Sequence, residues 1–178
     1  MSSSEQASII QSVAELLAHA LELEYASQAH YEQLADSMHV HHNTDVADLF
    51  RRLAVLSAEH AAAVAYRAGD TELPRIPPWA FKWECPNAPE GSDCLDPAIS
   101  YAMSTAQAIE LALHNERRGH VFYEQVAASA TDTDARELAA EMATEEREHV
   151  AMLEALLVSE RRREDNAPED LDPPHMPD

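Results

Sequence analysis

Residues 24–35 read EYASQAHYEQLA, and residues 116–127 read ERRGHVFYEQVA. Both segments contain a Tyr-Glu-Gln run followed by an aliphatic residue and alanine, and each opens with a glutamate seven residues before its tyrosine. Agreement in identity and in register is typical of an internal duplication. The segments therefore predict two copies of one structural unit, in which Glu24 and Glu116 occupy equivalent places.

A second repeat follows each of these segments. A Thr-Asp pair begins at Thr44 and again at Thr133, and a histidine, His60 or His149, lies sixteen residues after each threonine. Threonine followed by an acid is typical of a helix N-terminus, because the hydroxyl can cap free backbone amides. The repeated unit is thus predicted to be a pair of helices, and a pseudo-twofold site between the two copies would explain the repeat.

Composition favours an entirely helical chain. Hydrophobic residues make up 46% of the 178 residues, and only 3 residues are glycine. Apolar residues recur at steps of three and four, and Asp96-Pro97 has the form of a helix cap followed by proline at the first helical position. The predicted helices span about 6–38, 44–68, 97–130 and 133–162.

The segments between these helices predict their connections. Short polar turns at about 39–43 and 130–133 make each pair of helices an antiparallel hairpin. The segment at about 69–96 has no apolar periodicity, and as a crossover it can run the length of a bundle. The predicted fold is one all-α domain over 1–162, a four-helix bundle of two hairpins joined by a long crossover. The acidic segment 163–178 is predicted to be a disordered tail.

Acidic residues interrupt the apolar stripes of three helices. Glu24 lies in the stripe of the first helix, Glu116 in that of the third, and Glu146 and His149 in that of the fourth. Buried carboxylates need a counter-charge, and a metal ion between the helices would supply it. Oxygen and nitrogen ligands suit iron or manganese, and also zinc. The core positions predicted for the fourth helix are Met142, Glu146, His149, Leu153 and Leu156.

These residues resemble the metal site of the rubrerythrin branch of the ferritin-like family. That site takes one glutamate from each of two helices and a Glu-x-x-His pair from each of the other two. By position, Glu24 and Glu116 match the single glutamates, Glu146 and His149 match one pair, and His60 matches the histidine of the second pair. The resemblance covers roughly 6–160, and it implies a ferritin-like bundle that holds one or two iron ions.

The sequence departs from that pattern at two positions. Ser57 stands where the second pair should have its glutamate, and Glu59 lies about 100° around the helix from His60, so it should not replace that ligand easily. Rubrerythrin-type proteins also often carry an extra glutamate where this chain has Gly119. These departures predict an asymmetric site with one weakened metal position. His60 is either a ligand or a core histidine bonded to a carboxylate.

Four residues are predicted to surround the ligands, namely Tyr31, Tyr123, Ser57 and His120. The two tyrosines should lie beside the site, with their hydroxyls on the glutamates or in plain core packing. His120, one turn after Glu116, fits either the surroundings of the site or the surface. The cluster of His39, His41 and His42 in the first turn is interpreted as a solvated loop, with a stray metal site as the alternative.

The resemblance implies that bound iron reacts with dioxygen or hydrogen peroxide, as in a ferroxidase or a peroxidase. Typical rubrerythrins append a rubredoxin domain with two C-x-x-C knuckles, whereas this chain has only Cys85 and Cys94. An enzyme of this kind would need an external electron donor. Two alternatives stay open: non-catalytic sequestration or delivery of iron, and a bundle whose site has decayed and which is kept for assembly.

The formal charge of -21 argues against nucleic acid or an anionic membrane as a partner. Neither a signal peptide nor a membrane-spanning stretch is visible, so a cytoplasmic location is expected. Trp79, Phe81 and Trp83 are expected to hold the crossover on the bundle or to form a dimer contact. A homodimer is the expected assembly, because ferritin-like bundles commonly pair.

Overall fold

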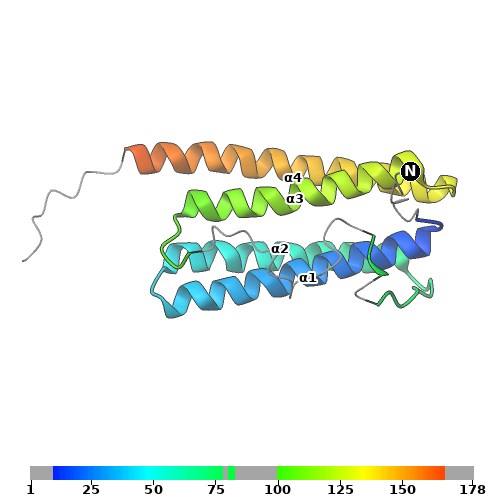
Figure 1. Cartoon of the computed structure of the whole chain (residues 1–178), viewed down its shortest axis with the longest axis horizontal. Helices are drawn as coiled ribbons and strands as arrows, with labels where there is room; N and C mark the ends of the chain where they lie inside the picture. The colour runs from blue at the N-terminus through cyan, green and yellow to red at the C-terminus, as the bar shows by residue number, and fades with distance from the viewer. Residues whose placement is uncertain (1–9, 78–79, 83–99, 167–178) are drawn as a thin grey trace, which may run out of the picture.

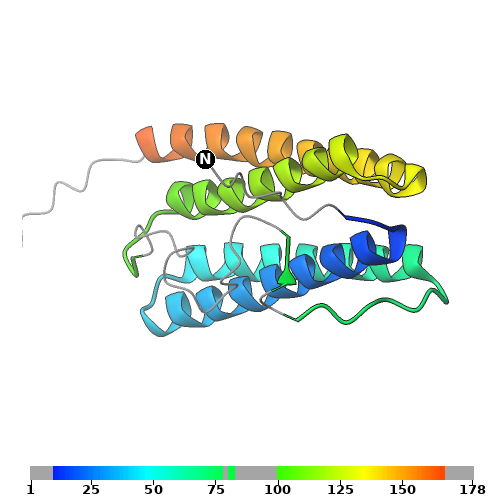
Figure 2. The same cartoon turned by 45° about the vertical axis from the view of Figure 1, so that its right-hand side comes forward.

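Four helices form the part of the chain that the structure describes, which is residues 10–77, 80–82 and 100–166 of a computed structural model. Within these residues there is no β-strand. The α1 helix packs along α2 and the α3 helix along α4, and the two hairpins lie side by side (Figures 1 and 2). The predicted all-α bundle of two hairpins is confirmed. The helices are α1 (Val13–Val40), α2 (Thr44–Ala68), α3 (Thr105–Ser129) and α4 (Thr133–Asp165).

The order of the helices requires a long crossover. The α2 helix ends at the end of the bundle where α1 begins, whereas α3 begins at the opposite end, beside the turn between α1 and α2 (Figure 1). Asn43 in that turn donates hydrogen bonds from Nδ2 to the carbonyl oxygens of Tyr101, at 3.1 Å, and Met103, at 2.8 Å. The start of α3 is therefore held against the first hairpin, and α2 and α3 run in the same direction.

Two helices begin later than the sequence predicted. The α1 helix begins at Val13 rather than near residue 6, because the Ser12 side chain accepts a hydrogen bond from a backbone N–H of the first turn. Residues 100–104 are not helical, and α3 begins after Ser104, which forms a capping box with Gln107. In both cases a serine satisfies free amides of the first turn and so fixes the start of the helix.

The fourth helix also differs in detail from the expected one. Its cap is Asp132, whose side chain accepts a hydrogen bond from the backbone N–H of Ala135 at 2.9 Å, so Thr133 is the first helical residue and not the cap. The helix continues to Asp165, past the end expected at about 162. The rest of the expected tail, Asp96-Pro97 and both cysteines lie outside the described residues.

The core consists of two apolar clusters at different heights along the bundle. One lies toward the turn between α1 and α2 and includes Tyr31, Phe50 and Ile109. The other lies toward the opposite end and includes Leu17, Val64, Phe122, Tyr123 and Met142. In α1 the buried Glu24 falls between the two clusters, and in α4 the buried Glu146 does so. The core is thus divided by a polar layer near mid-length.

One residue of the predicted core is at the surface. Leu156 of α4 is 43% exposed, whereas Leu157 is 9% exposed and packs in the core. The next inward-facing residue after the buried Leu153 lies four positions later, at Leu157, whereas the predicted step of three leads to Leu156. None of the described helices combines the length and the apolarity that crossing a membrane would need.

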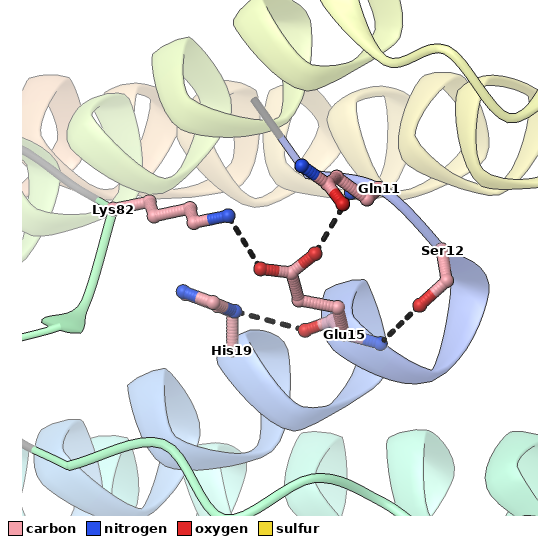
Figure 3. Close-up of polar contacts among 5 residues, drawn as sticks. All are labelled: Gln11, Ser12, Glu15, His19 and Lys82. Carbon is pink, nitrogen blue, oxygen red and sulfur yellow. Dashed lines mark hydrogen bonds and ion pairs between the residues drawn. The ribbon is translucent and has the colours of Figure 1, made fainter. Parts of the chain in front are cut away.

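A short part of the crossover contacts the start of α1 (Figure 3). Lys82 forms an ion pair with Glu15, and the Phe81 ring meets the edge of the His19 ring with centroids 5.7 Å apart. His19 is buried, and its Nδ1 lies 2.8 Å from the carbonyl oxygen of Glu15. Burial lowers the pKa of His19, which favours the neutral ring. Phe81 thus packs on the bundle as expected, whereas Trp79 and Trp83 lie outside the described residues.

Candidate metal centre

Three of the predicted ligands come together between α3 and α4. Glu116 lies on α3, and Glu146 and His149 lie three residues apart on α4. Nδ1 of His149 is 3.5 Å from Oε2 of Glu116 and 3.6 Å from Oε2 of Glu146. Each of the three residues offers one donor atom within 4.8 Å of the other two, which is close enough to share one ion. We call these residues the α3–α4 half of the centre.

The other two predicted ligands face this group from α1 and α2. Nδ1 of His60 lies 3.7 Å from Oε2 of Glu24. The rings of His60 and His149 are stacked, with centroids 4.3 Å apart and 8° between their planes, so they join the two hairpins. We call Glu24 and His60 the α1–α2 half. The structure thus brings all five predicted residues into one polar layer.

This layer is largely shielded from water. The exposed fraction of the five side chains ranges from 9% for Glu146 to 22% for the two histidines. Tyr31 belongs to one apolar cluster and Tyr123 to the other, so the two rings cover the centre from opposite ends. Charges placed here interact more strongly than they would at the surface.

Ionisation in the α3–α4 half reflects this burial. Burial, and then the neighbouring carboxylates of Glu116 and Glu24, raise the pKa of Glu146 to about 8. Contact with Glu116, and then with Glu146, raises the pKa of His149 to about 10. Burial also raises the pKa of Glu116, but its contacts with His149 and Glu146 lower it more, and the net shift is downward. The carboxylates therefore favour added positive charge, which protons or a metal ion can supply.

Two local features fit a bound cation. Nδ1 of His149 is buried and has no hydrogen-bond partner within the described part of the chain, although two carboxylate oxygens lie near it. Gly119 leaves space beside Glu146, since a Cβ atom there would lie 3.4 Å from the carboxyl carbon and 3.5 and 3.6 Å from its oxygens. Carboxylate oxygens with imidazole nitrogen suit iron, manganese and zinc.

Comparison with known proteins agrees with this geometry. The Rubrerythrin family matches residues 15–157, which is most of the chain. The chain belongs to the rubrerythrin family. It is also similar to the crystal structure of an uncharacterized conserved protein from Magnetospirillum magnetotacticum MS-1, with 35% sequence identity and a TM-score of 0.63, over 84% of this chain and 95% of that chain. The search of curated proteins gave no match.

Rubrerythrin-family proteins typically bind iron, but this member has an incomplete α1–α2 half. Ser57 is buried, with 5% of its surface exposed, at the position where the family pattern has a glutamate. Glu59 is exposed on α2 and so does not take its place. The α1–α2 half therefore lacks the carboxylate that Glu146 supplies in the other half. The rubrerythrin-type pattern is complete in three of its four helices.

The two tyrosines of this rubrerythrin-family centre have different surroundings. The Tyr31 hydroxyl accepts a hydrogen bond from Nδ2 of Asn115 at 3.2 Å. Burial raises the pKa of Tyr31 and of Tyr123, and the nearby glutamates raise both further, so both hydroxyls keep their protons. Asn115 was not predicted from the sequence. Asparagine has a low helix propensity, so its position inside a predicted helix, directly before Glu116, could have indicated a specific contact.

Other histidines have partners outside the five residues. Nδ1 of His120 lies 2.8 Å from the carbonyl oxygen of Ala143, and Nε2 lies 3.4 Å from Glu124, so this residue ties α3 to α4. His39, His41 and His42 are exposed, and the His41 ring stacks on Tyr101 with centroids 3.7 Å apart. Of the residues that the structure describes, only Glu116, Glu146 and His149 form a group of three metal-binding side chains.

Proposed function

We propose that this rubrerythrin-family protein binds iron between its two hairpins and uses it to reduce dioxygen or hydrogen peroxide. The observation that carries the proposal is the buried Nδ1 of His149, which faces Glu116 and Glu146 and has no hydrogen-bond partner among the described residues. A cation among these atoms would compensate the carboxylates and give the nitrogen a partner. The proposed ligands are Glu24, His60, Glu116, Glu146 and His149.

The residues would act in three ways. Glu116 and Glu146 would hold the ion as charged oxygen ligands, and His149 would bind through its neutral nitrogen. Tyr31 and Tyr123 would limit the access of water, because both rings are buried beside the centre. Ferrous iron, when bound, would supply electrons. Reduction of one hydrogen peroxide to two water molecules takes two electrons and two protons, so continued turnover would need an external electron donor.

Anaerobic titration of the metal-free protein with ferrous iron, followed by dioxygen or peroxide, tests this function. We expect tight binding and then oxidation of the bound iron, detected as new ferric absorption. Glu146→Gln should lose both. Glu148→Gln is the matched control, because Glu148 lies on the same helix but is exposed. The proposal fails if wild-type protein binds no ferrous iron, or if the two variants bind it equally well.

Sequestration or delivery of iron is the second candidate function. It is favoured by Ser57, which removes a charged ligand from the α1–α2 half and so would ease the release of an ion. Turnover separates the two functions. Repeated consumption of peroxide with an added reductant would support the enzyme, whereas one round of oxidation followed by retention of the iron would support the storage or delivery protein.

A further inference from the structure

The two halves of the centre offer different numbers of ligands. The α3–α4 half has three, and one donor atom from each lies within 4.8 Å of the others. The α1–α2 half has two, Glu24 and His60, and Oε2 of Glu24 lies 3.7 Å from Nδ1 of His60. The stacked rings of His60 and His149 place both halves in one centre. The centre therefore contains two neighbouring groups of ligands, one from each hairpin.

The difference arises at Ser57. Ser57 precedes His60 by three residues, as Glu146 precedes His149, so the two positions are equivalent in the repeat. The Ser57 side chain is buried but short and neutral, and it cannot supply the charged oxygen that Glu146 supplies. Glu59 is exposed and so does not compensate. The α1–α2 half consequently lacks one anionic ligand.

The charges of the carboxylates also favour one tightly bound divalent ion. Glu116 and Glu146, when ionised, carry two negative charges and balance one divalent ion. A second divalent ion would raise the total to four positive charges against three carboxylates, because the other half adds only Glu24. The five side chains are between 9% and 22% exposed, so an unbalanced charge here is costly.

We propose that the centre holds one resident divalent ion in its α3–α4 half, and that the α1–α2 half binds a second ion only weakly and exchanges it. The inference rests on the proposed function, since it concerns the ions of the same centre. Ser57 is then the residue that sets the number of tightly bound ions. The second ion binds and dissociates as a substrate does, while the first ion remains bound.

Titration of the metal-free protein with Mn²⁺, with the bound ions counted by equilibrium dialysis, tests this inference. We expect one tightly bound ion per chain in the wild type and two in Ser57→Glu. The affinity for the second ion should rise roughly 10- to 100-fold, the range in which changes around a metal site commonly act. Ser57→Gln is the matched control, because it adds the same bulk without the charge, and it should retain one tight ion.

The outcomes separate this inference from the proposed function. No tight ion in the wild type, with Mn²⁺ or with ferrous iron, would overturn the proposed function itself. Two tight ions of equal affinity in the wild type would overturn only the inference, and so would a single ion in a correctly folded Ser57→Glu. If circular dichroism shows that this variant does not fold, the electron paramagnetic resonance spectrum of wild-type protein decides. Signals of isolated Mn²⁺ support the inference, and a magnetically coupled pair overturns it.

Discussion

The two hairpins of the bundle repeat the same scaffold but differ where their inner faces meet. Both keep a glutamate on the first helix, a tyrosine two turns later and a histidine on the second helix. Only the α3–α4 hairpin keeps the second glutamate. At matched positions the first hairpin has Glu24, Ser57 and His60, and the second has Glu116, Glu146 and His149.

This difference shows that packing and ligand content can change independently. Ser57 and Glu146 are both buried, with 5% and 7% of the whole residue exposed, so the bundle is closed at both positions. Apolar clusters above and below the polar layer hold the helices in either case. The scaffold is thus symmetric, whereas the carboxylates are concentrated in the α3–α4 half. Variants that alter one half at a time can therefore test this difference.

The largest effect is expected from removing one carboxylate from each half in turn. A ligand present at 100 to 1,000 times its dissociation constant stabilises a fold by about 3 to 4 kcal/mol. Glu146→Gln should lose most of the stabilisation that Mn²⁺ gives, because the α3–α4 half then has a single carboxylate. Glu24→Gln should keep most of it. Thermal unfolding with and without Mn²⁺ measures both, and equal losses would contradict the asymmetry.

The second prediction concerns the pH dependence of the metal-free protein. The pKa of Glu146 is raised to about 8, so the folded state holds a proton that the unfolded state loses near the ordinary glutamate pKa of 4.5. The stability gained from this proton is fully present below pH 4.5, and it is lost as the pH rises through about 8.

Glu146→Gln should therefore be more stable than wild type above pH 8, by on the order of 1 kcal/mol or more, and the advantage should shrink toward acid pH. Denaturant unfolding at several pH values, in the presence of a chelator, measures this difference. Ser57→Ala is the comparison in the other half. It removes no titratable group, so the free energy of unfolding should depend on pH as it does in the wild type. A Glu146→Gln curve parallel to the wild type would refute the prediction.

A smaller effect is expected at Gly119. Glycine inside a helix costs about 1 kcal/mol relative to alanine, and a Cβ at this position would meet the Glu146 carboxyl group only at ordinary contact distance. Gly119→Ala should therefore raise the melting temperature of the metal-free protein by about 2 to 4 °C.

Ser27, the matched residue of α1, supplies the control for Gly119. Ser27→Ala changes an ordinary helical residue, so it should have a smaller effect on the melting temperature. Differential scanning calorimetry can compare the two variants directly. A lower melting temperature for Gly119→Ala would mean that the space beside Glu146 cannot be filled without displacing the carboxylate.

Much of the fold and of the centre could be predicted from the repeat. The register of Glu24 with Glu116 and of His60 with His149 gave two equivalent hairpins, and the apolar stripes turned the acids inward. The starts of α1 and α3 were harder, because the capping serines Ser12 and Ser104 lie several residues after the predicted starts near 6 and 97. Leu156 was misplaced because a step of three and a step of four both fit one helical face.

Contacts between distant helices could not be predicted in this way. The hydrogen bond from Asn115 to Tyr31 joins α3 to α1, and it depends on which helices lie side by side. The raised pKa of Glu146 depends in part on Glu24 in the other hairpin, and the raised pKa of His149 depends first on Glu116 in the neighbouring helix. Periodicity gives the face on which a residue lies, but it does not give that residue's partner.

The smallest effect is expected at this bond between Asn115 and Tyr31, which has no counterpart in the repeat. The residue before Glu24 that matches Asn115 is Leu23, and leucine cannot donate the equivalent bond to Tyr123. Tyr31→Phe should cost about 1 kcal/mol of unfolding free energy, because the half-buried amide of Asn115 loses its acceptor.

A double-mutant cycle of Tyr31→Phe with Asn115→Leu isolates this bond, and denaturant unfolding of the metal-free protein measures each variant. If the bond acts between the two residues alone, the double variant should lose less unfolding free energy than the sum of the losses in the two single variants. Tyr123→Phe is the matched control and should show no coupling to Asn115→Leu. Coupling of equal size at both tyrosines would mean that the halves communicate through the whole polar layer, and the difference between them would then be confined to Ser57.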